Sequence, residues 1–332
     1  MKKTFRRTVV FGLLALAAPF AALPLAKPAT TDLQSTTPPP EVLPEPAATP
    51  LPVYTAAPMQ RSFNASAPIL ICDDGENTSV SVQDFLIGTA ACELPPDWPD
   101  DAILAQMVAA HSYALSLGGA AFSCNSAQCA GWTTAEVLRA RWGGEFSTYY
   151  SRLAALADEA AGAVLCWEGS PAAACYHSIS AGHTEASQNV WETALPYLQG
   201  VPSPADLAAD GYEVTVQYSP EQVSAVLLAL GLAPGSDPAA WFGDAVRDDA
   251  GYVTAQTVCG SRVPGTKMRR AFHLRSASFT VEYDGTSFCF TTHGYGHGVG
   301  LSQYGAKALA EQGSTWQEIL LYYFPGCEVR QP

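Results

Sequence analysis

Residues 27–59 constrain the fold most strongly, because a segment of this composition cannot form part of a packed core. Pro, Thr and Ala dominate it, as in Pro38-Pro-Pro40 and Pro44-Glu-Pro46. Such sequences favour an extended, solvated backbone. We therefore predict a tether at residues 27–59 and one folded domain at residues 60–332, which is long enough to bury a full core.

Residues 1–26 have the pattern of an export signal. Four Lys and Arg residues lie among the first seven, and the stretch Thr8–Ala26 that follows is uncharged. This run fits a cleaved signal peptide, and it also fits a signal anchor, because a membrane-spanning helix needs about 20 residues. We expect export across the cytoplasmic membrane. Secretion would follow cleavage, and an uncleaved segment would anchor the chain with its basic end in the cytoplasm.

The chain is acidic, with 17 Lys and Arg against 31 Asp and Glu and a net charge of −14. This balance argues against a nucleic-acid partner, because phosphate binding needs clustered cations. A hydrophobic content of 48% with only 14% charged residues excludes a wholly disordered chain. Export would permit disulfides among the nine Cys residues. The pairs Cys124–Cys129 and Cys166–Cys175 could close short loops, but the sequence leaves the pairing open.

The first informative segment predicts a helix from Asp101 to Leu117. Apolar residues recur at helical spacing at Ile103, Met107, Ala110 and Ala114. Asp100 and Asp101 come at its start, where a carboxylate can cap a helix and interact with its dipole. The alternative is a rigidly held carboxyl group beside a cleft, available for general acid/base catalysis.

Hydrogen-bonding side chains are dense in a second segment, residues 174–191. They are His177, Ser178, Ser180, His183, Thr184 and Glu185. A strand at Cys175–Ile179 would place Cys175 and His177 on one face. Together with His183 they would supply three zinc ligands. The alternative is a loop in which both histidines are only hydrogen-bonded.

The third segment, residues 292–306, is rich in glycine. The glycines stand at positions 294, 296, 298, 300 and 305. They allow positive φ and close approach to a ligand, although a purely structural loop would also use them. A phosphate-binding loop is a poor match, because no Gly-Lys-Ser/Thr follows. The side chains of His297, Gln303 and Tyr304 instead suit sugar hydroxyls and amides.

In this order, the three segments resemble the motifs of the stage II sporulation protein D family, which also includes amidase-enhancer proteins. The residues that carry the resemblance are Gln106, Val108, Ala109, Ala110 and Tyr113 in the first motif, Ser178, Ser180, Gly182, Thr184, Glu185 and Trp191 in the second, and Gly294 to Ala306 in the third. The match covers residues 68–329.

The resemblance implies a lytic transglycosylase that cleaves peptide-free glycan strands of peptidoglycan during spore engulfment. One carboxyl group would protonate the glycosidic oxygen and then deprotonate the muramic acid 6-hydroxyl. A non-catalytic alternative is a glycan-binding module that recruits or stimulates an N-acetylmuramoyl-L-alanine amidase. Glycan strands, an amidase and membrane sporulation proteins are the partners that the resemblance implies. The resemblance implies no required cofactor and is compatible with a bound zinc ion.

The resemblance places Asp101 at the position of the family's catalytic Glu. Asp is shorter by one methylene, and a misplacement of about 1 Å can cost about a hundredfold in rate. The implied substrate-binding residues are Gln106, Tyr113, Ser178, Ser180, Thr184, Glu185, His297, Ser302, Gln303 and Tyr304. The resemblance places His177 and His183 at plausible zinc-ligand positions, and the strand pattern adds Cys175 as the third candidate ligand.

The fold class expected from these patterns is α+β, with short strands around the second and third motifs. Besides residues 101–117, helices are predicted at 134–161 and 314–323. Residues 211–264 are predicted to form an inserted lobe beside the cleft, with a helix at 220–230.

Overall fold

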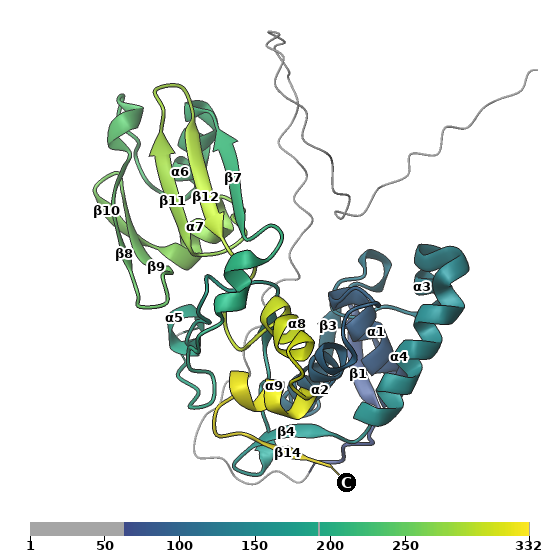
Figure 1. Cartoon of the computed structure of the whole chain (residues 1–332). Coiled ribbons are helices and arrows are strands. Elements are labelled where there is room, and N and C mark those ends of the chain that lie inside the picture. Colours follow the sequence, from purple (N-terminus) through teal and green to yellow (C-terminus); the bar gives the residue numbers. More distant parts are fainter. Residues whose placement is uncertain (1–62, 192, 332) are drawn as a thin grey trace, which may run out of the picture. The chain divides into compact units, whose positions relative to one another are not determined.

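The computed structural model describes residues 63–191 and 193–331 (Figure 1). The predicted signal or anchor at 1–26 and the predicted tether at 27–59 lie outside these residues. Within the described ranges, each helix is too short or too polar to span a bilayer.

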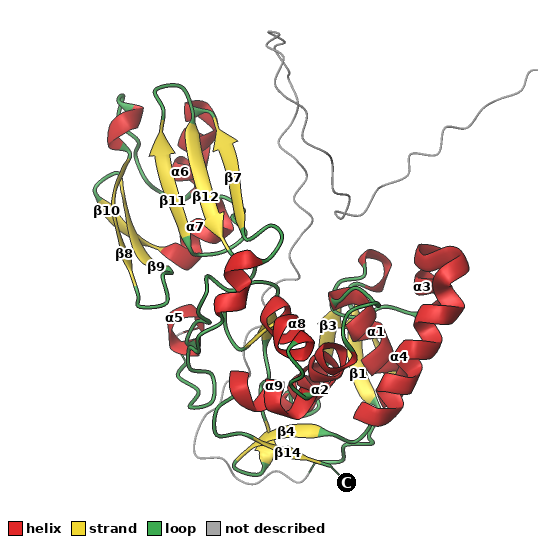
Figure 2. Cartoon of the chain, in the orientation of Figure 1, coloured by secondary structure: helices red, strands yellow, loops and turns green. Residues whose placement is uncertain are grey.

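Helices and short strands are mixed along the described chain (Figure 2). The α-helices are α1 (Val82–Glu93), α2 (Asp100–Ser116), α3 (Ala135–Trp142), α4 (Phe146–Ala160), α5 (Ser187–Trp191), α6 (Pro220–Ala229), α7 (Gly265–Ala271), α8 (Gln303–Glu311) and α9 (Trp316–Tyr323). The strands are β1 (Ile69–Asp73), β2 (Glu76–Val80), β3 (Phe122–Cys124), β4 (Val164–Trp167), β5 (Ser170–Pro171), β6 (Tyr176–His177), β7 (Glu213–Tyr218), β8 (Phe242–Arg247), β9 (Val253–Val258), β10 (Ser261–Pro264), β11 (Phe279–Tyr283), β12 (Phe288–His293), β13 (Leu301–Ser302) and β14 (Glu328–Arg330). This confirms the α+β class.

Helix α2 forms the centre of the main body. Its side chains are buried almost all around, and it packs against α1, α4, α8, α9 and β4. A helix that is apolar on every side needs such surroundings. Its only charged residues, Asp100 and Asp101, stand in the first turn. The predicted helix at 101–117 is thereby confirmed to within a residue at each end.

The prediction of one continuous helix at 134–161 is wrong. Helix α3 ends at Trp142, and Gly143 follows it with φ +52°, a left-handed conformation that breaks the helix. A short 3-10 turn, Gly143–Glu145, then leads into α4. The predicted helix at 314–323 corresponds to α9, which Thr315 caps through its side chain.

A lobe with its own hydrophobic core is inserted in the sequence between two parts of the main body. The sheets β11-β12-β7 and β10-β9-β8 build it together with α6 and α7. Its core includes Val223 and Leu227 from α6, Phe272 after α7, and Phe279 and Phe290 from the sheet. This core continues well past residue 264, where the lobe was predicted to end, because β11 and β12 pair back onto β7.

Cysteines come together across the sequence rather than in short loops. The sulfur atoms of Cys92 and Cys129 lie 2.7 Å apart, and the Arg141 side chain donates to the Cys129 sulfur. Cys129 thus approaches Cys92 instead of Cys124. All nine cysteines are free thiols in the structure.

Candidate functional site

Glu93 is the last residue of α1, and its position follows from the local sequence. Leu94 caps the helix in an extended conformation, and Pro95 and Pro96 cannot continue it. The carboxyl group therefore projects from the C-terminal end of a helix, where the helix dipole disfavours a negative charge. The residue is half-buried.

Burial raises the pKa of the Glu93 carboxyl from its ordinary 4.5 to about 7. A hydrogen bond from Gln303 Nε2 to Glu93 Oε2, 3.2 Å long, opposes the shift by stabilising the carboxylate. The phenol of Tyr176 is also close. Burial raises the pKa of Tyr176, and the negative charge of Glu93 raises it further. A carboxyl group with a pKa near 7 can donate and accept a proton at neutral pH.

Gln303 links the first motif to the third. It begins α8, and the Ser302 side chain caps that helix by accepting from Gly305 N. Its Nε2 also lies 3.4 Å from Gln106 Oε1 on the buried helix α2. Both amide side chains are almost fully buried, so Gln106 fixes Gln303 and Gln303 orients the Glu93 carboxyl.

Aromatic and basic side chains cluster around Tyr304, the residue after Gln303. The Tyr304 ring meets the Trp98 ring edge-on with centroids 5.1 Å apart, and Lys307 Nζ lies 5.5 Å from the Trp98 centroid. Tyr304 follows Gln303 in α8, and Trp98 stands in the turn between α1 and α2. Partly exposed rings of this kind can stack on sugars while their polar atoms stay wet.

The structure places Asp101, the expected acid/base, at the start of another helix, where its side chain caps a backbone N–H. Its Oδ1 accepts a hydrogen bond of 2.9 Å from Trp316 N, the first residue of α9. The carboxylate thus satisfies an otherwise unpaired N–H and faces the positive end of that helix. The neighbouring Asp100 pairs with Arg152.

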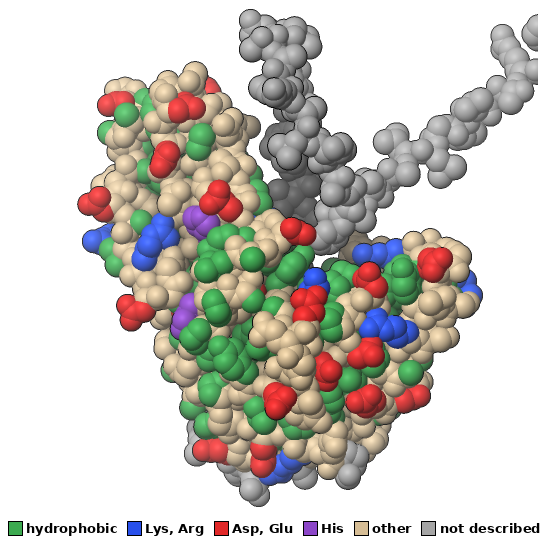
Figure 3. Space-filling view, in the orientation of Figure 1, with side chains coloured by type: hydrophobic (Ala, Val, Ile, Leu, Met, Phe, Trp, Pro, Cys, Tyr) green, Lys and Arg blue, Asp and Glu red, His purple; other side chains and the backbone are tan. Residues whose placement is uncertain are grey.

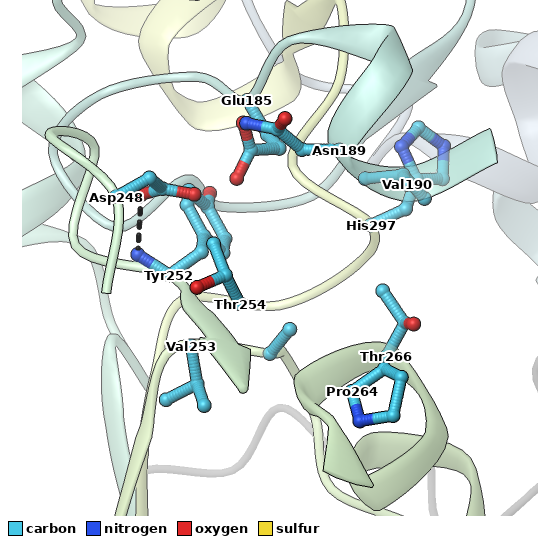
Figure 4. A pocket seen from close by; sticks show the side chains of 11 residues that line it. Glu185, Asn189, Val190, Asp248, Tyr252, Val253, Thr254, Pro264, Thr266 and His297 are labelled. Atoms are coloured by element: carbon cyan, nitrogen blue, oxygen red, sulfur yellow. Dashed lines mark hydrogen bonds between the residues drawn. The ribbon is translucent and has the colours of Figure 1, made fainter. Parts of the chain in front are cut away.

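Glu185 and His297 lie together in a separate pocket, which Figure 4 shows from close by. Its cavity of about 240 Å³ is also lined by Asn189, Asp248 and Tyr252. Glu185 is 3% exposed and accepts from Asn189 Nδ2 at 2.9 Å. Burial raises the pKa of Glu185 to about 8, and a hydrogen bond with Asp248 adds to the shift. The Glu185 carboxyl is therefore mostly protonated at neutral pH.

Most of the remaining predicted binding residues form hydrogen bonds within the protein. Thr184 accepts from Val201 N at 2.8 Å, and Ser180 N donates to Asp206 Oδ2 at 2.9 Å. Ser302 donates to the other Asp206 oxygen, and the Ser178 carbonyl accepts from Tyr304 N. The Tyr113 ring is buried. Asp206, which the sequence analysis did not single out, thus joins the second and third motifs.

Cys175, His177 and His183 do not form a metal site. Among residues 63–191 and 193–331, no three His, Cys, Asp or Glu side chains come close enough to hold an ion. The Nδ1 atoms of His177 and His183 lie at hydrogen-bond distance from the Val299 and Thr184 carbonyls. Burial lowers the pKa of His177 to about 4 and raises that of Cys175 to about 12, so both side chains are neutral.

The glycines of the third motif pack against the second motif instead of against a ligand. Strand β13 pairs in parallel with β6. A Cβ at Gly300 would lie 2.3 Å from the Cys175 carbonyl oxygen, and one at Gly294 would lie 2.6 Å from that of Ile179. Both glycines also have positive φ. The structural interpretation of the glycine-rich loop therefore accounts for these two positions.

Comparison with known proteins finds similar sequences among stage II sporulation proteins. The family model described as stage II sporulation protein matches residues 75–167. Stage II sporulation protein D of Bacillus amyloliquefaciens is 27% identical over 83% of this chain and 82% of its own length. The protein of that name from Bacillus subtilis is 27% identical over 80% of this chain and 79% of its own.

The chain is thus similar to stage II sporulation protein D over most of its length. A third relative, the amidase enhancer of Bacillus subtilis, is 25% identical over 73% of this chain but only 39% of its own length. The segment that matches the stage II sporulation protein model contains Glu93, Asp101 and Gln106, whereas Glu185 and Gln303 lie outside it.

Sequence reasoning missed Glu93, which stands only eight residues before Asp101. The signal was present, because an acidic residue directly before Leu94-Pro-Pro96 stands at a forced helix end. Its contact with Gln303, 210 residues away, was not visible without the fold.

Proposed function

We propose that this protein cleaves peptide-free glycan strands of peptidoglycan by a lytic transglycosylase mechanism, with Glu93 as the single acid/base. The observation that carries this proposal is the half-buried Glu93 carboxyl, whose pKa is raised to about 7 and which Gln303 and Gln106 hold in place. A dry, oriented carboxyl group next to aromatic side chains suits glycosidic chemistry.

The reaction would use both protonation states of Glu93. The protonated carboxyl gives its proton to the glycosidic oxygen, and the C1–O bond of the muramic acid breaks. The resulting carboxylate then takes the proton of the muramic acid 6-hydroxyl, and O6 bonds to C1 to close a 1,6-anhydro ring. Glu93 ends protonated, so one group serves both steps, unlike the two carboxyl groups of ordinary glycosidases.

Similarity to stage II sporulation protein D supports a sporulation-related function at the cell wall. Such work takes place outside the cytoplasmic membrane, and we propose that residues 1–26 direct export and either anchor the chain or are removed. The acidic composition suits an uncharged or sparsely charged polymer better than a nucleic acid.

The alternative is a glycan-binding module that recruits or stimulates an amidase without cleaving glycan. Similarity to an amidase enhancer over 73% of this chain favours it. The same aromatic side chains, Trp98 and Tyr304, would then serve binding alone.

The products formed from amidase-treated peptidoglycan distinguish the two functions. We predict anhydro-muramyl ends, detected by mass spectrometry, when the purified protein acts on this substrate. New reducing ends without anhydro rings would contradict the transglycosylase mechanism, because they require water as the nucleophile. Intact strands together with faster release of stem peptides by an added amidase would favour the alternative.

A further inference from the structure

Arg275 is a half-buried cation without a carboxylate partner. It lies between α7 and β11, and among residues 63–191 and 193–331 no ion pair or side-chain hydrogen bond engages its guanidinium. Burial lowers its pKa, although the nearby phenols of Tyr295 and Tyr304 oppose this shift. Partial burial of an unpaired charge is costly, so such a group is commonly kept for a ligand.

An arginine without an acidic partner is unusual in a chain with so many acidic side chains. The whole chain carries a net charge of −14, and Figure 3 shows acidic side chains spread over one face with fewer basic ones between them. Several other cations are paired with acids, as Arg152 is with Asp100 and Lys307 with Glu311. The exposed Asp210 influences Tyr304 but forms no ion pair with Arg275.

Contacts connect Arg275 to the Glu93 site. Its guanidinium carbon lies 4.2 Å from the centroid of the Tyr295 ring, which is 41% exposed. Its carbonyl oxygen accepts from Gly296 N at 2.9 Å, which ties this turn to the glycine-rich loop. Burial raises the pKa of Tyr304, and the charge of Arg275 opposes this shift. Tyr304 directly follows Gln303, and Gln303 donates a hydrogen bond to Glu93. The guanidinium is therefore stacked on the Tyr295 ring, the Arg275 backbone is fixed to the glycine-rich loop, and the charge reaches Tyr304.

The proposed substrate carries a matching anion. In peptidoglycan the stem peptide is joined to the lactyl group of muramic acid through an amide bond. When an amidase hydrolyses that bond, the lactyl group keeps a free carboxylate, whereas a strand with its peptides has a neutral amide there. Arg binds carboxylates through two parallel N–H···O bonds, a geometry that Lys cannot reproduce.

We infer that Arg275 binds the lactyl carboxylate of muramic acid and so makes the site specific for strands from which the peptides have been removed. This inference rests on the proposed function, since it assumes that Glu93 acts on the same strand. Arg275 is thereby a specificity-determining residue, and it takes no part in proton transfer.

Binding measurements in a Glu93→Gln background test this inference without requiring cleavage. The two probes are amidase-treated glycan oligomers and the same oligomers with their lactyl carboxylates converted to neutral methylamides. We expect E93Q to bind the free carboxylate form about 10- to 100-fold more tightly, as charged hydrogen bonds contribute in proteins. The added change R275Q should abolish this preference, and R275K should restore it only in part.

Arg262→Gln is the matched control, because Arg262 is an exposed arginine on β10 of the same lobe. It should leave the preference unchanged, and circular dichroism melts should show that each variant is folded. Equal affinity of E93Q for both probes, no binding of either probe, or an undiminished preference in R275Q would overturn the inference. Cleavage of both probes at equal rates by the wild type would overturn it while leaving the proposed function intact. If the preference depends on Arg275 but the wild type cleaves neither probe, the inference about Arg275 is supported and the proposed cleavage is refuted.

Discussion

At the scale of single residues, two carboxyl groups eight positions apart have opposite environments. Asp101 accepts from Trp316 N at the positive end of α9, whereas Glu93 stands at the negative end of α1 with its pKa raised to about 7. The first environment stabilises a carboxylate, and the second favours a carboxyl group that can exchange protons. We therefore assign the capping role to Asp101 and propose the acid/base role for Glu93.

Asp101→Ala should reduce the free energy of unfolding by about 1 kcal/mol, the usual cost of losing a helix cap. The change leaves the Trp316 N–H without its partner. Asp101→Asn is the matched control, because an amide oxygen can still accept this hydrogen bond. Urea unfolding of the three proteins measures the difference, and equal stability of D101A and wild type would contradict the capping role.

The sequence identified the residue types of the site but not their partners. Gln106 and Gln303 were both predicted as binding residues, and the structure places them 3.4 Å apart. Glu93 was overlooked because helical periodicity locates a helix without showing which carboxyl group meets a residue 210 positions away. Thr184 was predicted as a binding residue, yet its hydroxyl serves the backbone.

At the scale of elements, the turn between β8 and β9 contacts the second motif through two carboxyl groups. Asp248 Oδ1 accepts from Tyr252 N at 2.9 Å, which fixes the turn, and the side chain lines the same pocket as Glu185 and adds to the rise in the Glu185 pKa that burial causes. In the folded protein the pKa of Glu185 is about 8, above its ordinary value of 4.5. The neutral Glu185 carboxyl therefore contributes its full stabilisation to the fold below pH 4.5. That stability is lost as the pH rises through 8.

Asp248→Asn should therefore lessen the loss of stability between pH 5 and pH 9. It removes the charge beside Glu185 and keeps a hydrogen-bonding side chain, so the Glu185 pKa should fall. The free energy of unfolding of the wild type should decrease by about 1 kcal/mol per pH unit from this group alone, and that of the variant by less. Melting temperatures at both pH values measure this effect. Asp249→Asn, an exposed neighbour, should behave as wild type, and parallel losses in D248N and wild type would refute the effect of Asp248 on the Glu185 pKa.

Element boundaries were predictable only where local signals set them. The helix at 101–117 followed from periodicity and from Pro99 before it, and Ser219 and Pro220 mark the start of α6. The break at Gly143 was missed because Gly is tolerated within helical patterns. The end of the lobe was missed because it depends on β12 pairing with β7, which lies more than 70 residues earlier.

At the scale of the whole molecule, the described residues form two hydrophobic cores, and the chain as a whole is acidic. The α+β class was predictable, because the sequence indicates short strands around the second and third motifs and separate helices elsewhere. The division into two cores was only partly predictable, since it depends on strand pairing over long distances. The proposed acid/base and its glutamines lie in the main body, while Arg275 belongs to the lobe.

Anhydro-muramyl release from amidase-treated peptidoglycan by Glu93→Gln and Asp101→Asn, compared with wild type at pH 6, tests the central claim most directly. Both substitutions replace a carboxyl group by an amide of the same size. We predict that E93Q loses at least about a hundredfold in rate, the usual contribution of general acid/base catalysis, while D101N stays within a few-fold of wild type. Rapid cleavage by E93Q together with an inactive, folded D101N would contradict the account.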